Sequence, residues 1–362
     1  MSRARDFADL AGSADAGGLT GRNLIINGAC VIDQRNGGAS VNASDTVFGV
    51  DRFNMFSQTA LATKGDFQQN AGSVTPPTGF TNYLGFTSTS AYTIASGEGL
   101  AIQQRIEGYN LAQLGWGSSD AKSATVSFWV RSSLTGTFGC SIRNSAGNRS
   151  YPFTYTISSA NTWEYKSVTI PGETTGTWLT TNGIGAYLLI GLGVGSTYSG
   201  TAGSWASANY IGATGATSVV ATNGATFYIT GVQLEVGEQA TPFEHRSYDD
   251  ELARCQRYYC KTYDDGVTPG TVTSNGIVMH SLDATQSYAK AVWDFPVTMR
   301  TTPTVVLYSP NNGTSGQVAG DASNYSGSTG YIGTNRVMGG VSGVSLSQSV
   351  YLKFHGTADA EL

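Results

Sequence analysis

A two-residue repeat of apolar and polar positions runs through much of the chain between residues 23 and 244. Val126, Phe128 and Val130 fall on one face of a short segment, as in a strand with one face in a core. In residues 188–195 every second position is Leu, Ile or Val, and glycines stand between most of them, so another backbone can approach that side closely. The pattern predicts an all-β domain of short strands packed as a sandwich.

The apolar positions change parity inside one predicted strand near the end of this domain. Phe227 and Ile229 are odd-numbered, whereas Val232 and Leu234 are even-numbered. A regular strand cannot place both pairs on one face, so the sequence predicts a β-bulge at residues 230–231.

Two short segments have helical spacing instead. Residues 3–10 form an amphipathic pattern, and a helix this short needs a packing partner. Residues 247–260 form the second, where Ser247 can cap the helix and acidic residues fill the first turn. Leu252, Cys255 and Tyr259 share one face of that helix.

Residues 264–362 return to an alternating pattern, which predicts a second, smaller β-sandwich. The segment 311–340 is nearly all Gly, Ser, Thr, Asn and Ala, with Tyr325 and Tyr331 inserted, and reads as a long loop. Near the end, five apolar residues share one parity, and His355 falls on the opposite, outward side. These apolar residues are Val344, Leu346, Val350, Leu352 and Phe354.

The expected organisation therefore has four parts. They are an N-terminal helical segment (1–22), an all-β sandwich (23–246), a linker helix (247–263) and a C-terminal β-sandwich (264–362).

Composition narrows the function classes. The 362 residues carry a formal net charge of −5, and the 20 Lys and Arg are scattered. A nucleic-acid binder needs a basic stripe and a membrane-surface protein a polybasic patch, so neither class is expected. No run is long enough to span a membrane, and residues 1–20 lack the apolar stretch of a signal peptide. We therefore expect synthesis and folding in a cytoplasm and no membrane insertion.

Motifs for catalysis, phosphate binding and metal binding are absent from the sequence. The three histidines have no metal-ligand spacing, and the four cysteines read as thiols outside any metal site. We expect no cofactor, no metal and no enzymatic activity. Four glutamates are expected to be solvated strand-edge residues, although two acids of a glycosidase could still meet in the fold. They are Glu107, Glu164, Glu173 and Glu235.

The remaining chemical signal is aromatic. Six Trp and 19 Tyr stand among many Asn, Ser and Thr residues. Flat rings beside short hydrogen-bonding side chains suit sugars, which have apolar faces and hydroxyl edges. Packing in the core is the alternative for each ring. The long Gly/Ser/Ala/Thr stretch 195–224 offers Tyr198, Trp205 and Tyr210.

Several segments resemble known phage proteins. ATFYITGVQLEVG (225–237), ATPFEHRSY (240–248) and ELARCQRYY (251–259) are similar to a segment recurrent in tail-fibre proteins of phages and prophages. NLIING (23–28), Gln34 with Arg35, and VDRF (50–53) look like the start of the same domain. FWVR (128–131) and WEY (163–165) resemble strands of jelly-roll carbohydrate-binding modules, and RARDFADL (3–10) resembles the virion-attaching tips of phage fibres.

The resemblance implies a jelly-roll-like sandwich in a virion tail fibre or spike that binds host cell-surface polysaccharide during adsorption. It implies a homotrimer, with Leu252, Cys255 and Tyr259 as interface candidates and packing within one chain as the alternative. Attachment to a tail or head protein of the virion would use Arg3, Arg5, Phe7 and Leu10. The glycan-binding candidates are Tyr308, Tyr325 and Tyr331 in the C-terminal sandwich, followed by Tyr198, Trp205 and Tyr210.

Two other functions stay open at this point. The chain could be a decoration or connector of the virion that binds no glycan, or a depolymerase that cleaves the glycan it binds.

Overall fold

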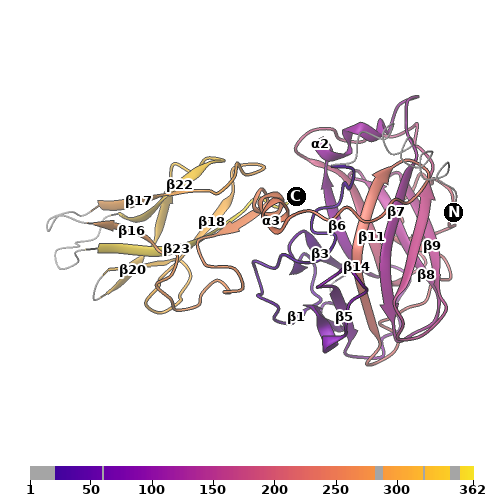
Figure 1. Ribbon diagram of the computed structural model, residues 1–362, viewed down its shortest axis with the longest axis horizontal. Coiled ribbons are helices and arrows are strands. Elements are labelled where there is room, and N and C mark those ends of the chain that lie inside the picture. Colours follow the sequence, from indigo (N-terminus) through magenta and orange to yellow (C-terminus); the bar gives the residue numbers. More distant parts are fainter. Residues whose placement is uncertain (1–20, 59–60, 282–287, 321–322, 343–350) are drawn as a thin grey trace. The chain divides into compact units, whose positions relative to one another are not determined.

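The computed structural model of the protein describes residues 21–58, 61–281, 288–320, 323–342 and 351–362 (Figure 1). The chain divides into two compact units. The first unit comprises Met1–Val31 and Gly38–Ser247, and the second comprises Ile32–Gly37 and Tyr248–Leu362. The N-terminal helical segment, with Arg3, Arg5, Phe7 and Leu10, lies outside the described residues.

The first unit is a sandwich of two antiparallel six-stranded sheets. The first sheet has the order β1 (Val41–Asn42), β4 (Gly65–Gln69), β5 (Leu84–Ser88), β14 (Thr226–Val236), β7 (Ala124–Ser132) and β10 (Glu164–Ile170). The second sheet has the order β2 (Phe48–Val50), β3 (Phe53–Ser57), β6 (Gly99–Glu107), β11 (Ile184–Val194), β8 (Gly136–Asn144) and β9 (Ser150–Ile157). In each sheet a later strand, β14 or β11, lies between three early strands and two middle ones, and the predicted jelly-roll-like, all-β fold is confirmed.

Short elements connect these strands. They are the 3-10 turns η2 (Ala71–Ser73) and η3 (Ala112–Leu114), the helix α2 (Gly108–Leu111), and the parallel pair β12 (Ser199–Gly200) and β13 (Gly212–Ala213).

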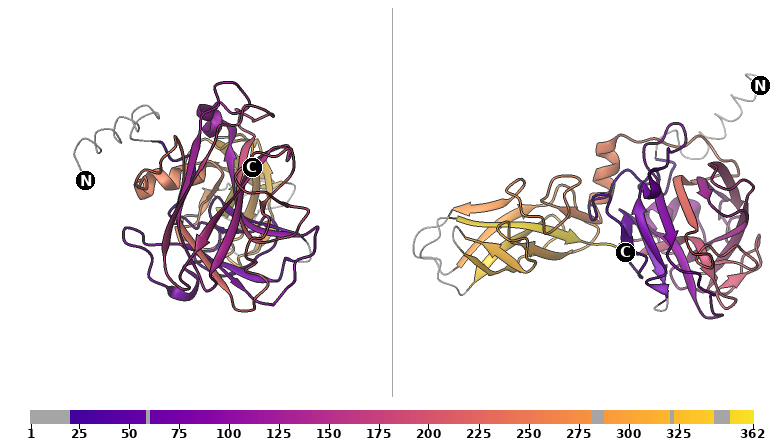
Figure 2. Two further views of the ribbon diagram at one scale, coloured as in Figure 1. Left: turned by 90° about the vertical axis from the view of Figure 1, so that its right-hand side faces the viewer. Right: turned by 90° about the horizontal axis from the view of Figure 1, so that it is seen from below.

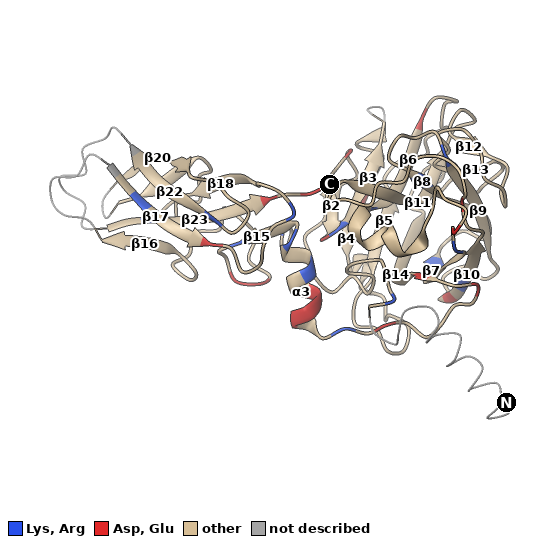
Figure 3. Ribbon diagram, turned by 90° about the horizontal axis from the view of Figure 1, so that it is seen from above, with Lys and Arg blue, Asp and Glu red and all other residues tan. Residues whose placement is uncertain are grey.

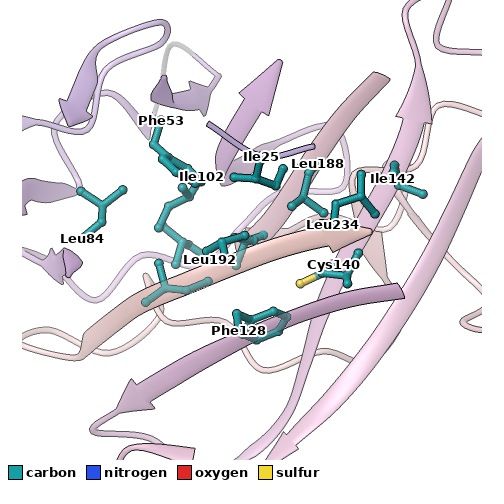
Figure 4. Close-up of a cluster of buried hydrophobic side chains, with 14 of the residues drawn as sticks. Ile25, Phe53, Leu84, Ile102, Phe128, Cys140, Ile142, Leu188, Leu192 and Leu234 are labelled. Atoms are coloured by element: carbon teal, nitrogen blue, oxygen red, sulfur yellow. The ribbon is translucent and has the colours of Figure 1, made fainter. Parts of the chain in front are cut away.

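The core of the first unit lies between the two sheets (Figure 4). Phe128 of β7 projects toward Cys140 and Ile142 of β8 and Leu188 of β11, which come from the opposite sheet. The side chains at 126, 128 and 130 are all buried there, as are those at 188, 190 and 192. The core face that the alternation predicts is therefore the face that the structure buries.

The β-bulge predicted at residues 230–231 is confirmed. The register of β14 against β7 shifts between Thr230 and Gln233, and Gly231 has a φ of +63°. A Cβ at Gly231 would come within 2.7 Å of the Phe80 ring and 3.3 Å of the Trp129 ring. Glycine is needed here for the backbone angle and for the space these rings occupy.

The segment 233–246, which carries much of the resemblance to tail-fibre proteins, anchors the start of the sandwich. Arg246 donates hydrogen bonds to the carbonyl oxygens of Asn23 and Ile25. Glu244 accepts from the backbone N–H of Asn23 at 2.8 Å and pairs with Arg246. Gln233 bonds to Glu235 and to the backbone N–H of Glu244. In the described structure these motif residues act as an internal clamp.

The second unit is a smaller sandwich around its own core, which confirms the predicted second β-sandwich (Figure 2, orange and yellow strands). One sheet is built on β23 (Tyr351–Asp359), which pairs with β15 (Tyr259–Lys261), β16 (Val278–Ser281), β18 (Thr304–Tyr308) and β19 (Gln317–Ala319); β20 (Asn324–Ser326) pairs with β19. The other sheet has the order β17 (Tyr288–Asp294), β22 (Arg336–Ser342) and β21 (Ser328–Gly330).

The linker helix is shorter than expected. Helix α3 spans Tyr248–Gln256, with its acidic residues in the first turn (Figure 3), and the chain then enters β15. The sequence pattern did not separate helix α3 from strand β15, because buried residues follow one another closely from the end of the helix into the strand. Both elements belong to the second unit. Residues 32–37 belong to it as well, because Gln34 donates a hydrogen bond to the Tyr259 carbonyl and the Arg35 guanidinium lies 3.8 Å from the centre of the Tyr259 ring.

The three trimer-interface candidates lie on this stretch. Cys255 and Tyr259 are buried and Leu252 is half-buried. Packing within one chain thus accounts for Cys255 and Tyr259, and the homotrimer stays a prediction. None of the described helices has the length and apolarity that crossing a membrane requires.

Two expectations for the second unit were wrong. His355 is buried rather than outward-facing, since Tyr263 stacks on its ring at 3.9 Å and Thr262 and Thr273 bond to its two nitrogens. The segment 311–340 is not a single loop, because it forms β19, β20, β21 and the start of β22. Leu352 and Phe354 are buried as predicted, and residues 344, 346 and 350 lie outside the described residues.

Candidate ligand-binding face

A row of polar residues crosses the second sheet of the first unit on the side that points away from the core. On β6 the core takes Leu100, Ile102 and Ile106, so strand alternation turns Gln103 and Arg105 to the other side. We call this side the outer face. Gln103 is in register with Asn54 of β3 and with Leu189 of β11, and Leu189 is in register with Ser141 of β8.

A second row runs beside the first. Arg105 of β6, Tyr187 of β11 and Arg143 of β8 are in register across three neighbouring strands. The Arg143 guanidinium lies 4.3 Å from the centre of the Tyr187 ring, and its Nη1 donates to Asn209 Oδ1 at 2.5 Å. The outer face therefore carries two guanidinium groups next to a tyrosine ring.

The segment 195–216 covers the remaining part of the outer face. Ile211 packs there with Ala101 and Leu189, and the half-buried rings of Phe56 and Tyr198 join this small cluster. The covering segment lies close to the sheet at Gly139, where a Cβ would come within 2.8 Å of the Ala213 backbone nitrogen. The same segment supplies Asn209, which places it at the edge of the two polar rows.

Three polar side chains on the outer face have buried atoms without a hydrogen-bond partner. Asn54 is 1% exposed and Gln103 is 2% exposed. Neither the amide nitrogen nor the oxygen of Asn54 has a partner, and the Gln103 Oε1 and the Arg143 Nε have none either. Leaving a buried polar group without a partner costs about 1–3 kcal/mol, so such groups are few in native proteins. Three such side chains on one face make it the candidate for hydrogen bonds with a ligand.

Burial also affects the charge of this face. It lowers the pKa of the Arg143 guanidinium, and the nearby charge of Arg105 acts in the same direction. The phenol groups of Tyr187 and Tyr198 oppose this shift. An anion at this position would favour the charged form of Arg143.

The structure separates the three aromatic candidates of segment 195–224. Tyr198 lies on the outer face with Phe56 and Tyr187. Trp205 instead packs edge-on against Trp116 and Trp178, and its indole N–H donates to the Pro171 carbonyl at 2.9 Å. The ring of Tyr210 lies against Gly200, where a Cβ would meet it at 2.3 Å.

The tyrosine candidates of the second unit have different surroundings. Tyr325 belongs to β20 and packs against the core of that unit. Tyr308 belongs to β18 and meets Tyr263 edge-on. Tyr331 is 80% exposed and has a φ of +50°. Of these three, Tyr331 presents its ring most fully to solvent.

The outer side of the first sheet also carries rings. Trp129 of β7 is in register with Tyr165 of β10, and their ring centroids are 5.5 Å apart. Tyr165 is 44% exposed. In contrast to the outer face of the second sheet, this pair stands beside no cluster of unpartnered buried polar groups among the described residues.

The expectation that four glutamates are solvated was wrong for three of them. Glu107, Glu173 and Glu235 are buried, and the half-buried Glu164 accepts from two backbone N–H groups. Glu173 pairs with Arg149, and Glu235 accepts hydrogen bonds from residue 241. Among the described residues, no group of three or more His, Cys, Asp and Glu side chains could hold a metal ion.

Sequence reasoning missed the polar residues of the outer face. Gln103 and Arg105 on β6, and Ser141 and Arg143 on β8, occupy the positions between core residues in the central part of the second sheet. Polar side chains at alternating positions of a strand ordinarily indicate a solvated face. The distinguishing feature is that Gln103, Ser141 and Arg143 are buried, and burial depends on the register of separate strands.

No protein-family model and no curated protein matches this sequence. Solved structures that align with it include the enzymatically active domain of bacteriophage CBA120 tailspike protein 4, at 12% identity and a TM-score of 0.30. That alignment covers 59% of this chain, which spans about a fifth (21%) of the tailspike chain.

Two further structures align over nearly all of their own length. A sugar-binding protein of Bacteroides thetaiotaomicron, assigned that role provisionally, aligns at 12% identity and a TM-score of 0.34 over 60% of this chain and 100% of its own. A family 11 carbohydrate-binding module of Clostridium thermocellum, solved with a mixed-linked tetrasaccharide, aligns at 13% identity and a TM-score of 0.27 over 54% of this chain and 95% of its own.

Proposed function

We propose that the protein binds a glycan on the outer face of the second sheet. The observation that carries this proposal is the set of buried, unpartnered atoms on the outer face, which are both amide atoms of Asn54 and the Oε1 of Gln103. They share this face with the rings of Tyr187 and Tyr198. An amide offers both donors and an acceptor, as a sugar hydroxyl does, and an aromatic ring suits the apolar face of a sugar. Arg143 and Asn209 extend the polar part of this face.

Because the amides are buried, the ligand must displace a covering side chain to reach them. The half-buried rings of Phe56 and Tyr198 are the groups that can turn aside. Side-chain changes of this kind are common when a binding face meets its ligand.

We further propose that this binding serves adsorption of a phage to its host, with the chain as a homotrimeric fibre or spike on the virion. The resemblance of residues 225–259 and of the N-terminal segment to tail-fibre proteins supports this context. Light scattering on the purified full chain should then give about three times the chain mass. A monomer at micromolar concentration would contradict the trimer and would have no bearing on the proposed glycan site.

The test of glycan binding is an array of bacterial surface polysaccharides probed with the full chain, followed by analysis of bound glycans for shortened products. We expect binding without cleavage. Release of oligosaccharide would favour a depolymerase, and absence of binding to every glycan would favour a decoration or connector protein.

A further inference from the structure

We propose that the glycan recognised on the outer face is acidic, and that Arg143 binds its anionic group. This inference rests on the proposed function. The shared chemistry is a pair of anionic oxygens, as in a carboxylate or a sulfate, which matches the planar fork of a guanidinium.

The structure holds the Arg143 side chain in a fixed plane. Its guanidinium stacks over Tyr187 at 4.3 Å, and its Nη1 bonds to Asn209. The turn between β8 and β9 backs it, since a Cβ at Gly147 would lie 3.1 Å from Nη1. A guanidinium positioned in this way loses little freedom when it takes a ligand.

The other edge of the fork is available for hydrogen bonds. Nε is buried and has no partner, and the only hydrogen bond of Arg143 within the described part of the chain is the one from Nη1. An approach along the Nε and Nη2 edge would give two parallel hydrogen bonds to two oxygens of one anion. Because Nε is buried, this approach needs the same displacement of covering side chains as the amides do.

Arg143 differs in its charge balance from four other arginines of low exposure. Arg22, Arg35, Arg149 and Arg246 each pair with a glutamate or aspartate. Among the described residues, no carboxylate pairs with Arg143, and its charged neighbour is a second guanidinium, Arg105. A buried charge is stabilised by a partner of opposite sign, so the missing counter-charge is the group that a ligand would bring.

The net charge of the chain indicates that an anion would be bound only at a local site. With a formal charge of −5 and basic residues scattered over both units (Figure 3), the protein as a whole does not attract anions. Binding of an acidic glycan would therefore depend on a local site, and a single substitution in that site should weaken it strongly.

The experiment compares acidic glycans with their neutral counterparts. Full-length protein is titrated with hyaluronan, alginate, polygalacturonate and polysialic acid, and with the same polymers after their carboxylates are reduced to alcohols. Dextran sulfate and dextran form the second pair. We expect binding to at least one acidic polymer and its loss in the neutral counterpart, with the pair that shows the loss identifying carboxylate or sulfate as the anion.

Two variants locate the anion site. Arg143→Gln should weaken acidic binding on the order of tenfold to a hundredfold, the range for one hydrogen-bonded charge pair. Arg131→Gln is the matched control, because Arg131 also lies near a tyrosine ring and donates to one carbonyl, but on the first sheet. Its binding should stay at the wild-type level. Melting curves confirm that both variants fold, and Arg143→Lys, which keeps the charge without the fork, should fall between wild type and Arg143→Gln.

Each contrary outcome has a distinct meaning. Binding to neutral polymers alone, or wild-type binding by Arg143→Gln, overturns the acidic inference and leaves glycan binding intact. No binding to any polymer overturns both.

Discussion

Replacing Asn54 with leucine should stabilise the first unit and remove its ligand binding. Both polar atoms of the Asn54 side chain are buried and unpartnered, and leucine has the same branching with methyl groups in their place. Removing one unsatisfied buried group should recover about 1–2 kcal/mol after some repacking. For a unit of this size, each kcal/mol raises the melting temperature by roughly 2–4 °C, so a rise of roughly 2–8 °C is expected.

Asn144 provides a control of the same residue type with the opposite expected sign. It is also buried, but its Nδ2 donates to Asn148 and Thr177, and its Oδ1 accepts from two backbone N–H groups. Asn144→Leu removes all four bonds and leaves their partners behind, which should cost about 3 kcal/mol or more.

Calorimetry and glycan titration on both variants decide the question. A fall in melting temperature for Asn54→Leu comparable to that of Asn144→Leu would show that Asn54 is a satisfied structural residue. A higher melting temperature with unchanged glycan affinity would place the ligand elsewhere.

Three other outcomes can be checked on the full chain. Burial lowers the pKa of His355 below its usual 6.5, and the opposing effects of Thr273 and Asp264 are weaker. The second unit should therefore lose stability as the pH falls below about 6.5. Calorimetry should show this loss in wild type and in the control His280→Gln, whose histidine is exposed, and a smaller loss in His355→Gln. Arg246→Ala should cost the first unit about 3–5 kcal/mol in urea unfolding, since it removes the counter-charge of Glu244 and the donor to two carbonyls. A cost near zero would show that the clamp is dispensable. Tyr331→Ala should leave the melting temperature unchanged because its ring is exposed, and Tyr325→Ala should lower it because its ring packs against the core. If either variant reduces adsorption to cells while still folded, the second unit takes part in recognition.

The features that the sequence predicted correctly depend on neighbours along one strand. The buried side of residues 126–130 follows from alternation, and the bulge at residues 230–231 follows from a parity change that no regular strand can absorb. Both are local, so one stretch of sequence is enough to predict them.

The outer face could not be predicted in the same way. Asn54, Gln103 and Arg143 come from three strands far apart in the chain, and only the pairing of β3, β6, β11 and β8 brings them to one surface. His355 illustrates the same limit, because its polar-side position on β23 becomes buried when Thr262, Tyr263 and Thr273 cover it. Aromatic content led the prediction toward exposed tyrosines, whereas the structure points to polar groups without partners.

One comparison of affinities decides whether the glycan binds the outer face of the second sheet. Glycan affinity is measured for wild type, for Gln103→Met on the outer face and for Tyr165→Ala on the first sheet, each shown to be folded. Methionine preserves the shape of glutamine and removes its hydrogen-bonding groups. We therefore expect glycan affinity to fall at least tenfold in Gln103→Met and to stay at the wild-type level in Tyr165→Ala. A hydrogen bond to a neutral ligand is worth about 0.5–1.5 kcal/mol, and leaving the ligand group unpaired adds to the loss. Unchanged glycan affinity in Gln103→Met together with loss of affinity in Tyr165→Ala would show that the glycan binds the first sheet instead.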